Sequence, residues 1–298
     1  QLEEQVYPRI GSGPAYALVR YSAGSSADPQ RRSPNWNRSF ELSSDSPAGG
    51  VLLLHGMSDS PYSLRALGTA LNKPRVKEIL TYHGIRTPDY QVFRPQDRIV
   101  LKEGLAFPLI VKPSHEDGSV GISDLSIVYN PNDLRKRVRY IHTEFQQPAL
   151  VEQYITGREL NVAILGSVHP QVLPISEIDF TGMPDSMHKI VSYEAKWMHG
   201  TPSYEGTRGV CPAKLSARQE AAIKRTALTC FHLIGCRDYA RVDFRLTPQG
   251  VPYVLEVNPN PDISDDAGFA RSARAAGYTF PDAIGKIVES ALERWNTK

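Results

Sequence analysis

The strongest constraint on the fold lies near the C-terminal end, where two apolar runs flank a turn at Thr247-Pro248-Gln249-Gly250. Proline and glycine in these positions favour a tight turn, so the two runs are expected to form a β-hairpin. Side chains alternate along a strand, so Glu256 and Asn258 share one face of the second strand, and the hairpin places Asp243 opposite them. Carboxylate and amide oxygens are the ligands that Mg²⁺ prefers. The hairpin therefore predicts a Mg²⁺ site for phosphate chemistry, and solvated surface acids are the alternative.

The composition is that of an ordinary soluble globular chain, with 298 residues, 41% hydrophobic and 22% charged. This length is enough for two domains or for one domain with lobes. The formal net charge of +2 gives no reason to expect a nucleic-acid partner. No apolar run approaches the ~18 residues of a membrane span, and no signal-peptide pattern begins the chain. Cys211, Cys230 and Cys236 lack metal-ligand spacing and are expected to be reduced, buried thiols of a cytoplasmic protein.

Periodicity predicts several helices and strands from residue 71 to the end of the chain. Helical spacing favours residues 71–84, 132–145 with Asn132 or Asp133 as cap, 216–234 and a last helix from about Pro281. Ser216 and Gln219 fit a capping box. Apolar runs predict strands over residues 107–112, 149–154, 159–165 and 172–180. Residues 183–207 have little periodicity and are interpreted as a long functional loop.

Two further segments carry groups suited to a nucleotide. Lys112 ends an apolar run and is followed by the loop Gly118-Ser119-Val120-Gly121, whose backbone N–H groups are able to bind phosphate. A plain turn is the alternative reading of that loop. Glu152 and Glu159 flank a segment that is able to contact adenine and ribose, although acids at strand ends are commonly solvated.

The order of these motifs resembles the ATP-grasp superfamily, and D-alanine–D-alanine ligase and its relatives are the most similar group. The motifs are NKPRVKEILTYHGIRTP, FPLIVKPSHEDGSVGIS, VEQYITGREL, SYEAKW, CRDYARVDFR and LEVNP. The resemblance runs from about residue 72 to the end. It implies an α+β fold of two lobes with the nucleotide between them, a first lobe over residues 72–150 and a second lobe with the metal site over residues 151–298.

The resemblance also implies ATP and Mg²⁺ as cofactors and a role for each motif residue. The groups that it assigns to ATP are Lys77, Lys112, Gly118, Ser119, Val120, Glu152, Gln153, Ile155, Glu159 and Lys196. Asp243, Glu256 and Asn258 are the implied metal ligands. Arg241 is the implied catalytic arginine, acting with Lys112 and Lys196, and a simple salt bridge to Asp243 is the alternative. The implied reaction joins a small-molecule carboxylate to an amine through an acyl phosphate.

Two positions depart from the dipeptide ligases. Asp262 stands where they have a glycine, and Ala267 stands where they have a serine that binds the second amino acid's carboxylate. An additional acid repels a free carboxylate. We therefore expect an altered pocket and a cationic or amine-bearing acceptor.

The N-terminal segment, residues 1–71, resembles instead the start of an α/β-hydrolase, with VLLLHG as an early strand of a short strand–loop–helix fragment. The chain contains no Gly-x-Ser-x-Gly nucleophile motif. The segment is interpreted as part of a fusion that packs on the ATP-grasp lobes or on a second subunit, which would be a homodimer. Two alternatives to the ligase remain: an esterase that uses His55 with Ser58 or Ser60, and an ATP-binding protein without ligase activity.

Overall fold

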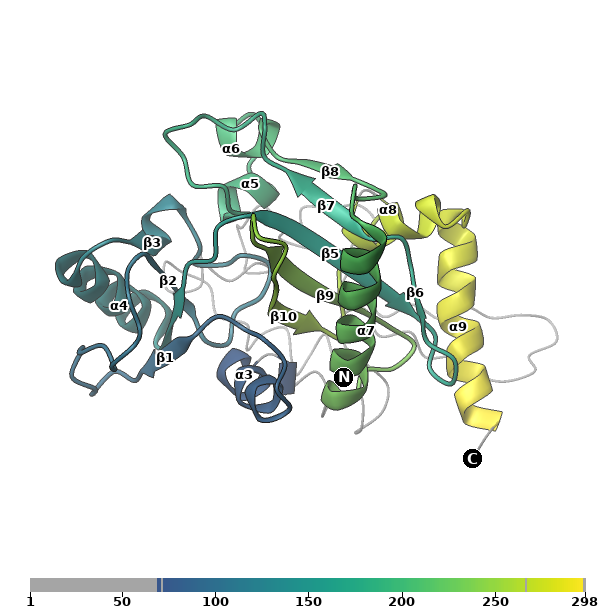
Figure 1. Cartoon of the computed structure of the whole chain (residues 1–298), viewed down its shortest axis with the longest axis horizontal. Helices are drawn as coiled ribbons and strands as arrows, with labels where there is room; N and C mark the ends of the chain where they lie inside the picture. The colour runs from purple at the N-terminus through teal and green to yellow at the C-terminus, as the bar shows by residue number, and fades with distance from the viewer. Residues whose placement is uncertain (1–68, 71, 266, 297–298) are drawn as a thin grey trace, which may run out of the picture. The chain divides into compact units, whose positions relative to one another are not determined.

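The computed structural model describes residues 69–70, 72–265 and 267–296, which form two antiparallel sheets with helices (Figure 1). The α/β-hydrolase fragment predicted for residues 1–71, with His55, Ser58 and Ser60, lies outside the described residues apart from 69–70. The mixture of helices and antiparallel strands confirms the predicted α+β class.

The first sheet has four strands in the order β1-β4-β2-β3. Their bounds are β1 (Tyr90–Phe93), β2 (Leu109–Pro113), β3 (Ile127–Val128) and β4 (Ala149–Gln153). Helix α4 (Pro131–Phe145) packs on this sheet through Leu134, Val138 and Ile141, which are buried with Val111 and Val151. The helix begins after Asn130, whose side chain accepts hydrogen bonds from two backbone N–H groups. The cap predicted at Asn132 or Asp133 is therefore wrong, because Pro131 occupies the first helical position and the chain before it supplies the cap.

The second sheet has six strands, five of them in the order β10-β9-β5-β7-β8, with β6 paired to β5. Their bounds are β5 (Arg158–Leu165), β6 (Gln171–Val172), β7 (Ser176–Asp179), β8 (Arg208–Val210), β9 (Tyr239–Leu246) and β10 (Pro252–Asn258). The hairpin predicted from the sequence is β9–β10. One continuous strand was expected over 172–180, but the chain divides it into β6 and β7 around Pro174, which has no N–H for a ladder.

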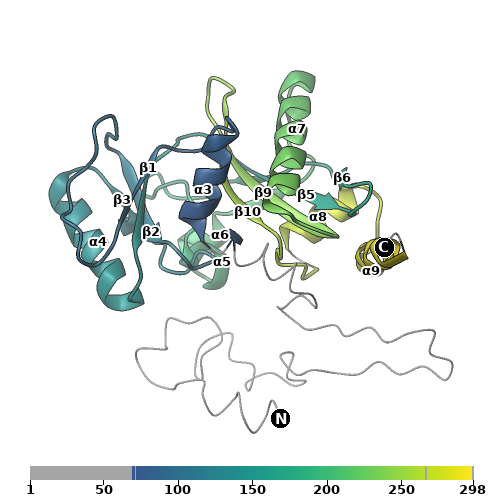
Figure 2. The same ribbon diagram turned by 90° about the horizontal axis from the view of Figure 1, so that it is seen from below.

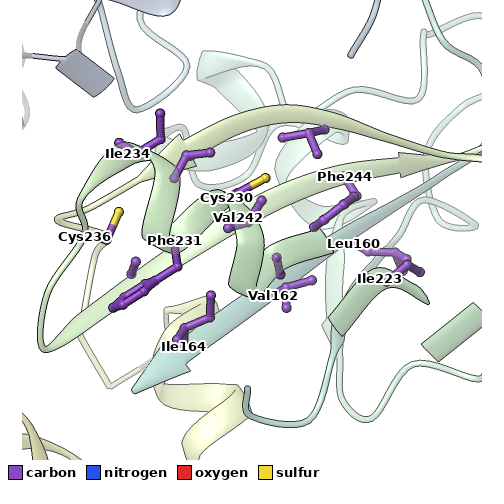
Figure 3. Packing of buried hydrophobic residues seen from close by; sticks show 14 of the residues in the cluster. Leu160, Val162, Ile164, Ile223, Cys230, Phe231, Ile234, Cys236, Val242 and Phe244 are labelled. Atoms are coloured by element: carbon purple, nitrogen blue, oxygen red, sulfur yellow. The ribbon is translucent and has the colours of Figure 1, made fainter. Parts of the chain in front are cut away.

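The core of this sheet lies between its central strands and α7 (Ala217–Ile234) (Figure 3). Alternate residues of β5 and β9 point toward the helix, among them Leu160, Val162 and Phe244, and each is fully buried. On the helix side, the residues buried in this core are Ile223, Ala227, Cys230, Phe231 and Ile234. Its capping box of Ser216 and Gln219 is confirmed.

Helices on the opposite face cover only part of the sheet (Figure 2). Helix α8 (Gly268–Ala275) packs through Phe269 and Ala273 on Ala163 and Leu165 of β5, and α9 (Phe280–Asn296) adds Ala283 to the same cluster. The rest of that face carries several polar side chains, among them Asn161 and Asp243. The other described helices are α3 (Lys73–Tyr82), α5 (Tyr193–Trp197), α6 (Pro202–Glu205) and the 3-10 turn η4 (Asp124–Ser126).

The segment 183–207, expected to be a loop, contains α5 and α6, each started by a hydroxyl cap from Ser192 or Thr201. Helices of four or five residues leave too little periodicity to detect in a sequence. None of the helices in the described part of the chain is long and apolar enough to cross a membrane.

The burial of Cys230 and Cys236 predicts unequal thiol reactivity. Burial destabilises the thiolate and raises the pKa of both groups to about 12, whereas Cys211 is only partly buried. At pH 8 the folded protein should react with Ellman's reagent through Cys211, and the other two thiols should react only in denaturant. Cys211→Ser should remove the native reaction. Rapid labelling of three thiols in the folded protein would contradict this packing.

Candidate active site

A row of polar side chains crosses the second sheet on the face away from α7. Glu256 of β10 is paired with Asp243 of β9, Asp243 with Asn161 of β5, and Asn161 with Ser176 of β7. Residues directly opposite each other in an antiparallel pair have their side chains on the same face. The placement of Asp243 opposite Glu256, predicted from the hairpin, is confirmed. Asn258 is paired with Arg241 one step along and lies on that face too.

A β-bulge at Leu255 brings Glu256 to this face. The register shifts between Val254 and Glu256, so that Phe244 is opposite Val254 and Asp243 is opposite Glu256. Val254 and Val257 both enter the core beside α7. A regular strand would put Val254 and Glu256 on the same face, so the additional residue separates the apolar from the acidic position.

Asp243 is held by three hydrogen bonds. Arg241 donates from Nε to Oδ1 and from Nη2 to Oδ2, each at 2.8 Å. Asn161 donates from Nδ2 to Oδ1, also at 2.8 Å. The salt bridge considered for Arg241 is therefore present. Burial opposes the charge on Arg241, but Asp243 outweighs it and raises the arginine pKa. Asn161 was not foreseen, because an asparagine inside an apolar strand gives no signal until its neighbour is known.

Cations surround Glu256. Burial disfavours its charged form, but Lys73, Arg241, Lys112 and Lys196 together hold the pKa of this carboxyl below its usual value. Lys73, in the first turn of α3, is the largest of these favourable contributions, and its ammonium also donates to the carbonyl of Glu116. The sequence reading chose Lys77 in the same helix and missed Lys73. Both lysines belong to the same motif. The structure distinguishes them by their partners, because Lys73 acts on Glu256 and Lys77 contacts Glu152.

The chemistry of the row suits a hard cation. Within the described ranges no three His, Cys, Asp or Glu side chains gather as a metal site. Two facing carboxylates and the Asn258 amide offer oxygen ligands only, and Asn258 also accepts a hydrogen bond from the N–H of Asn260 at 2.9 Å. Asp243 Oδ2 accepts a hydrogen bond from Arg241 through one lone pair, and its second lone pair is suited to a metal ion. These residues fit an oxygen-preferring ion that draws its other ligands from water or phosphate.

A second group of charges lies in the first sheet. The carboxylate of Glu152 on β4 contacts Lys77 of α3 through Oε1 and Lys112 of β2 through Oε2. All three side chains are buried. Lys77 also donates to Thr87 Oγ1 at 2.7 Å. The sequence placed these residues separately on phosphate and adenine, and the structure brings them into one contact.

The glycine loop is a strained turn that touches the segment carrying Lys196. Gly118, Ser119 and Gly121 have φ of 60°, 64° and 74°. A Cβ at Gly121 would lie 2.6 Å from the Pro113 ring, so only glycine fits there. Ser119 Oγ donates to the carbonyl of Val191 at 2.8 Å, and Trp197 Nε1 donates to the carbonyl of Gly118 at 2.9 Å. The loop and α5, with Lys196, are therefore held together. Val120 is buried.

Glu159 is paired with a buried arginine that the sequence reading did not single out. Arg245 Nη2 lies 2.8 Å from Glu159 Oε2, and the same guanidinium donates to the carbonyls of Gly157 and Lys189. Burial raises the pKa of Glu159, although Arg245 opposes that shift. Arg245 thus ties the start of β5 to the segment before α5. Gln153, the last residue of β4, is exposed, and Ile155, between β4 and β5, is buried.

The two positions at which we expect departures from the dipeptide ligases follow β10 in the chain. Asp262 Oδ1 accepts hydrogen bonds from Ser264 N at 2.9 Å and from Ser264 Oγ at 2.6 Å. Asp262 also contributes to the raised pKa of Arg241. Ala267 stands at the N-cap of α8 and offers no side-chain hydrogen bond.

The family model described as "D-ala D-ala ligase C-terminus" matches residues 79–289. The chain belongs to this family. A D-alanine--D-alanine ligase from Pelotomaculum thermopropionicum is 34% identical over 260 residues, which are 82% of this chain and 76% of that protein. An uncharacterized protein, y4sG, from Sinorhizobium fredii is also 34% identical, over 80% of this chain and 68% of its own.

Solved structures of D-alanine--D-alanine ligases are similar to this chain as well. A D-alanine--D-alanine ligase from Bacillus anthracis is 29% identical with a TM-score of 0.64, over 77% of this chain and 70% of that chain. A structure of the Bacillus anthracis enzyme complexed with ATP has a TM-score of 0.62 at 27% identity, over 77% and 68%. The expected ATP-grasp fold is thereby confirmed. The family match begins at residue 79, and the hydrolase-like reading of residues 1–71 stays a prediction.

The buried Glu152 contacts predict a pH-dependent loss of stability. Burial alone would raise the pKa of Glu152. The charges of Lys112 and Lys77 outweigh the effect of burial and hold this pKa below the ordinary 4.5. The stabilisation is therefore fully present above that value and is lost as pH falls through the folded-state pKa. Glu152→Gln should lower the free energy of unfolding by about 3 kcal/mol at pH 7, and the difference should shrink below pH ~4.5.

Urea unfolding across pH 3–8 measures this difference. Glu78→Gln is the matched control, because its ion pair with Arg75 is exposed. The control should change the free energy of unfolding by about 0.5 kcal/mol or less. Equal effects of the two substitutions at pH 7 would show that the buried contacts do not stabilise the protein.

Proposed function

We propose that this protein is an ATP-dependent carboxylate–amine ligase of the D-alanine–D-alanine ligase type. The observation that carries the proposal is the meeting of two kinds of group at one place. Glu256 and Asp243 face each other on β10 and β9, and lysines from α3, β2 and α5 all lower the pKa of Glu256. Carboxylates for a cation, ringed by lysines, are what a nucleoside triphosphate with its metal requires. Membership of the ligase family supports the same reading.

ATP and Mg²⁺ are the cofactors of this proposal. Asp243, Glu256 and Asn258 would hold Mg²⁺, which when bound offsets the negative charge of the phosphates. Lys73, Lys112 and Lys196 are the cations assigned to the phosphate groups, with the N–H groups of residues 118–120. Glu159 is assigned to the ribose, and the backbone of Gln153 and Ile155 to the adenine. Arg245 holds Glu159 in place for that contact.

The proposed reaction passes through an acyl phosphate. A carboxylate oxygen of the first substrate takes the γ-phosphoryl group from ATP, and ADP is the leaving group. An amine then attacks the carbonyl carbon of the acyl phosphate and loses a proton, and phosphate leaves. The protein's part is to position these groups and to offset charge. Arg241 is assigned to the oxyanion that forms during the attack, since its guanidinium is fixed by two bonds to Asp243 and stays charged.

The acceptor pocket is proposed to differ from that of the dipeptide ligases. Ala267 offers no hydroxyl at the start of α8, and Asp262 adds a carboxylate near Arg241. Both differences weaken binding of a free acceptor carboxylate, so an amine-bearing or cationic acceptor is favoured.

A reaction that uses ATP suits the cytoplasm. The homodimer and the lobes at 72–150 and 151–298 also remain proposals; β4 crosses residue 150 and pairs with β1 and β2.

The ligase proposal predicts ADP release that depends on Mg²⁺, a carboxylate and an amine. Purified protein should release ADP in a screen of amino acids and amines, and Lys112→Ala should reduce the rate at least about 100-fold, as for loss of a transition-state charge contact. Lys102→Ala, an exposed lysine beside the same sheet, should leave the rate unchanged. ATP binding without ADP release on any substrate would favour a nucleotide-binding protein that is not a ligase.

The metal row predicts a specific change in Mg²⁺ dependence. Asp243→Asn removes one of the facing carboxylates and should raise the Mg²⁺ concentration for half-maximal ADP release by about tenfold or more. Ser176→Ala, at the other end of the polar row, should not alter that concentration. An unchanged Mg²⁺ requirement in Asp243→Asn would place the metal elsewhere.

A further inference from the structure

We propose that Lys77 is a positioning residue that does not touch the nucleotide. Its ammonium offsets the charge of Glu152, and this leaves a net positive charge at Lys112 for the phosphate groups of ATP. The inference rests on the proposed function, because it concerns how that site attracts a nucleotide. It differs from the role expected for Lys77 from the sequence, which was direct contact with phosphate.

The surroundings of Lys77 leave its ammonium directed inward. The side chain is 1% exposed, and its Nζ donates to Thr87 Oγ1 at 2.7 Å and contacts Glu152. The Nζ also lies 5.9 Å from the centre of the Tyr90 ring. A hydroxyl, a carboxylate and an aromatic face are partners that together accommodate a buried ammonium.

The charge count explains why two lysines share one carboxylate. Glu152 Oε2 contacts Lys112 and Oε1 contacts Lys77, so two ammonium groups and one carboxylate have a net charge of +1. With Lys112 alone, Glu152 would form a neutral buried pair and would hold the ammonium that the phosphates need. An opposite charge a few ångströms away in a buried site cancels most of the field that a ligand experiences. Lys77 restores the positive charge without occupying the nucleotide site.

The same contacts fix the trio relative to the metal strand. Thr87, which accepts from Lys77, donates its hydroxyl proton to the carbonyl of Val254 on β10 at 2.9 Å. Val254 is two residues before Glu256. Lys77 therefore links the charged group of the first sheet to the strand that carries the proposed metal ligands.

Calorimetric titration with MgATP and with AMP tests the inference, because the ratio of the two affinities reports the polyphosphate contacts alone. Lys77→Met should weaken ATP binding about tenfold, within the range for coupled neighbours, and should change AMP binding little. The double variant Lys77→Met/Glu152→Gln again has a net charge of +1 and should recover ATP affinity to within about threefold of the parent.

The control and the opposing outcomes are defined by the same titrations. Lys102→Met is matched, since that exposed lysine lies 5.8 Å from the same Tyr90 ring, and it should bind ATP as the parent does. If the double variant binds ATP as weakly as Lys77→Met does, Lys77 contacts phosphate directly. If Lys77→Met binds ATP as the parent does, Lys77 neither contacts phosphate nor influences the charge of Lys112. Both results overturn the inference.

Thermal unfolding is the further readout that this test needs. It shows whether each variant is folded. If Lys77→Met is unfolded, only the double variant, which removes one charge of each sign, is compared with the parent, by its ratio of ATP to AMP affinity. A parent-like ratio of ATP to AMP affinity supports the inference, and a ratio reduced about tenfold overturns it. A parent protein that binds no MgATP would instead remove the proposed function, and this inference with it.

Discussion

The antiparallel register of β5, β9 and β10 is the constraint on which the rest of the site depends. Successive side chains on these strands point to opposite faces, so one set of residues builds the core with α7 and the other builds the polar row. Val242 and Phe244 are buried against the helix, and Asp243 between them faces the opposite side. A slip of one residue would exchange these faces, and burial of the charged set against α7 would then oppose folding. The apolar core thus fixes where the acids point.

Charge balance explains how so many ionisable groups are tolerated in one region. Each buried carboxylate has cations within reach: Arg241 at Asp243, Arg245 at Glu159, and two lysines at Glu152. Isolated buried charges would shift their pKa values until they became neutral. Pairing with an opposite charge offsets part of this cost, so the site offers both cations and anions. A ligand that carries both positive and negative charge, such as a metal-bound polyphosphate, is complementary to this arrangement.

The sequence predicted the parts of this site that depend on local pattern. The β9–β10 hairpin, α7 with its capping box, and the facing of Asp243 and Glu256 follow from alternation, turn residues and caps, and the structure has all of them. The short elements were missed, because β8, α5 and α6 contain three to five residues each and are stabilised by their neighbours rather than by periodicity. Partners distant in sequence were missed too. Glu152 contacts Lys77, which lies 75 residues earlier in the sequence, and no local pattern records that contact.

The bulge at Leu255 has a consequence for how this strand is able to vary. Val254 and Val257 belong to the core and Glu256 to the polar face, which a regular alternation would not allow. Removal of a single residue between positions 254 and 256 would restore the alternation and turn either the valines outward or the acid inward. The turn at residues 247–250 carries no such requirement, since it lies beyond the paired positions Leu246 and Pro252. Among descendants of this sequence, length changes should therefore collect in the turn, while the seven residues of β10 keep their number.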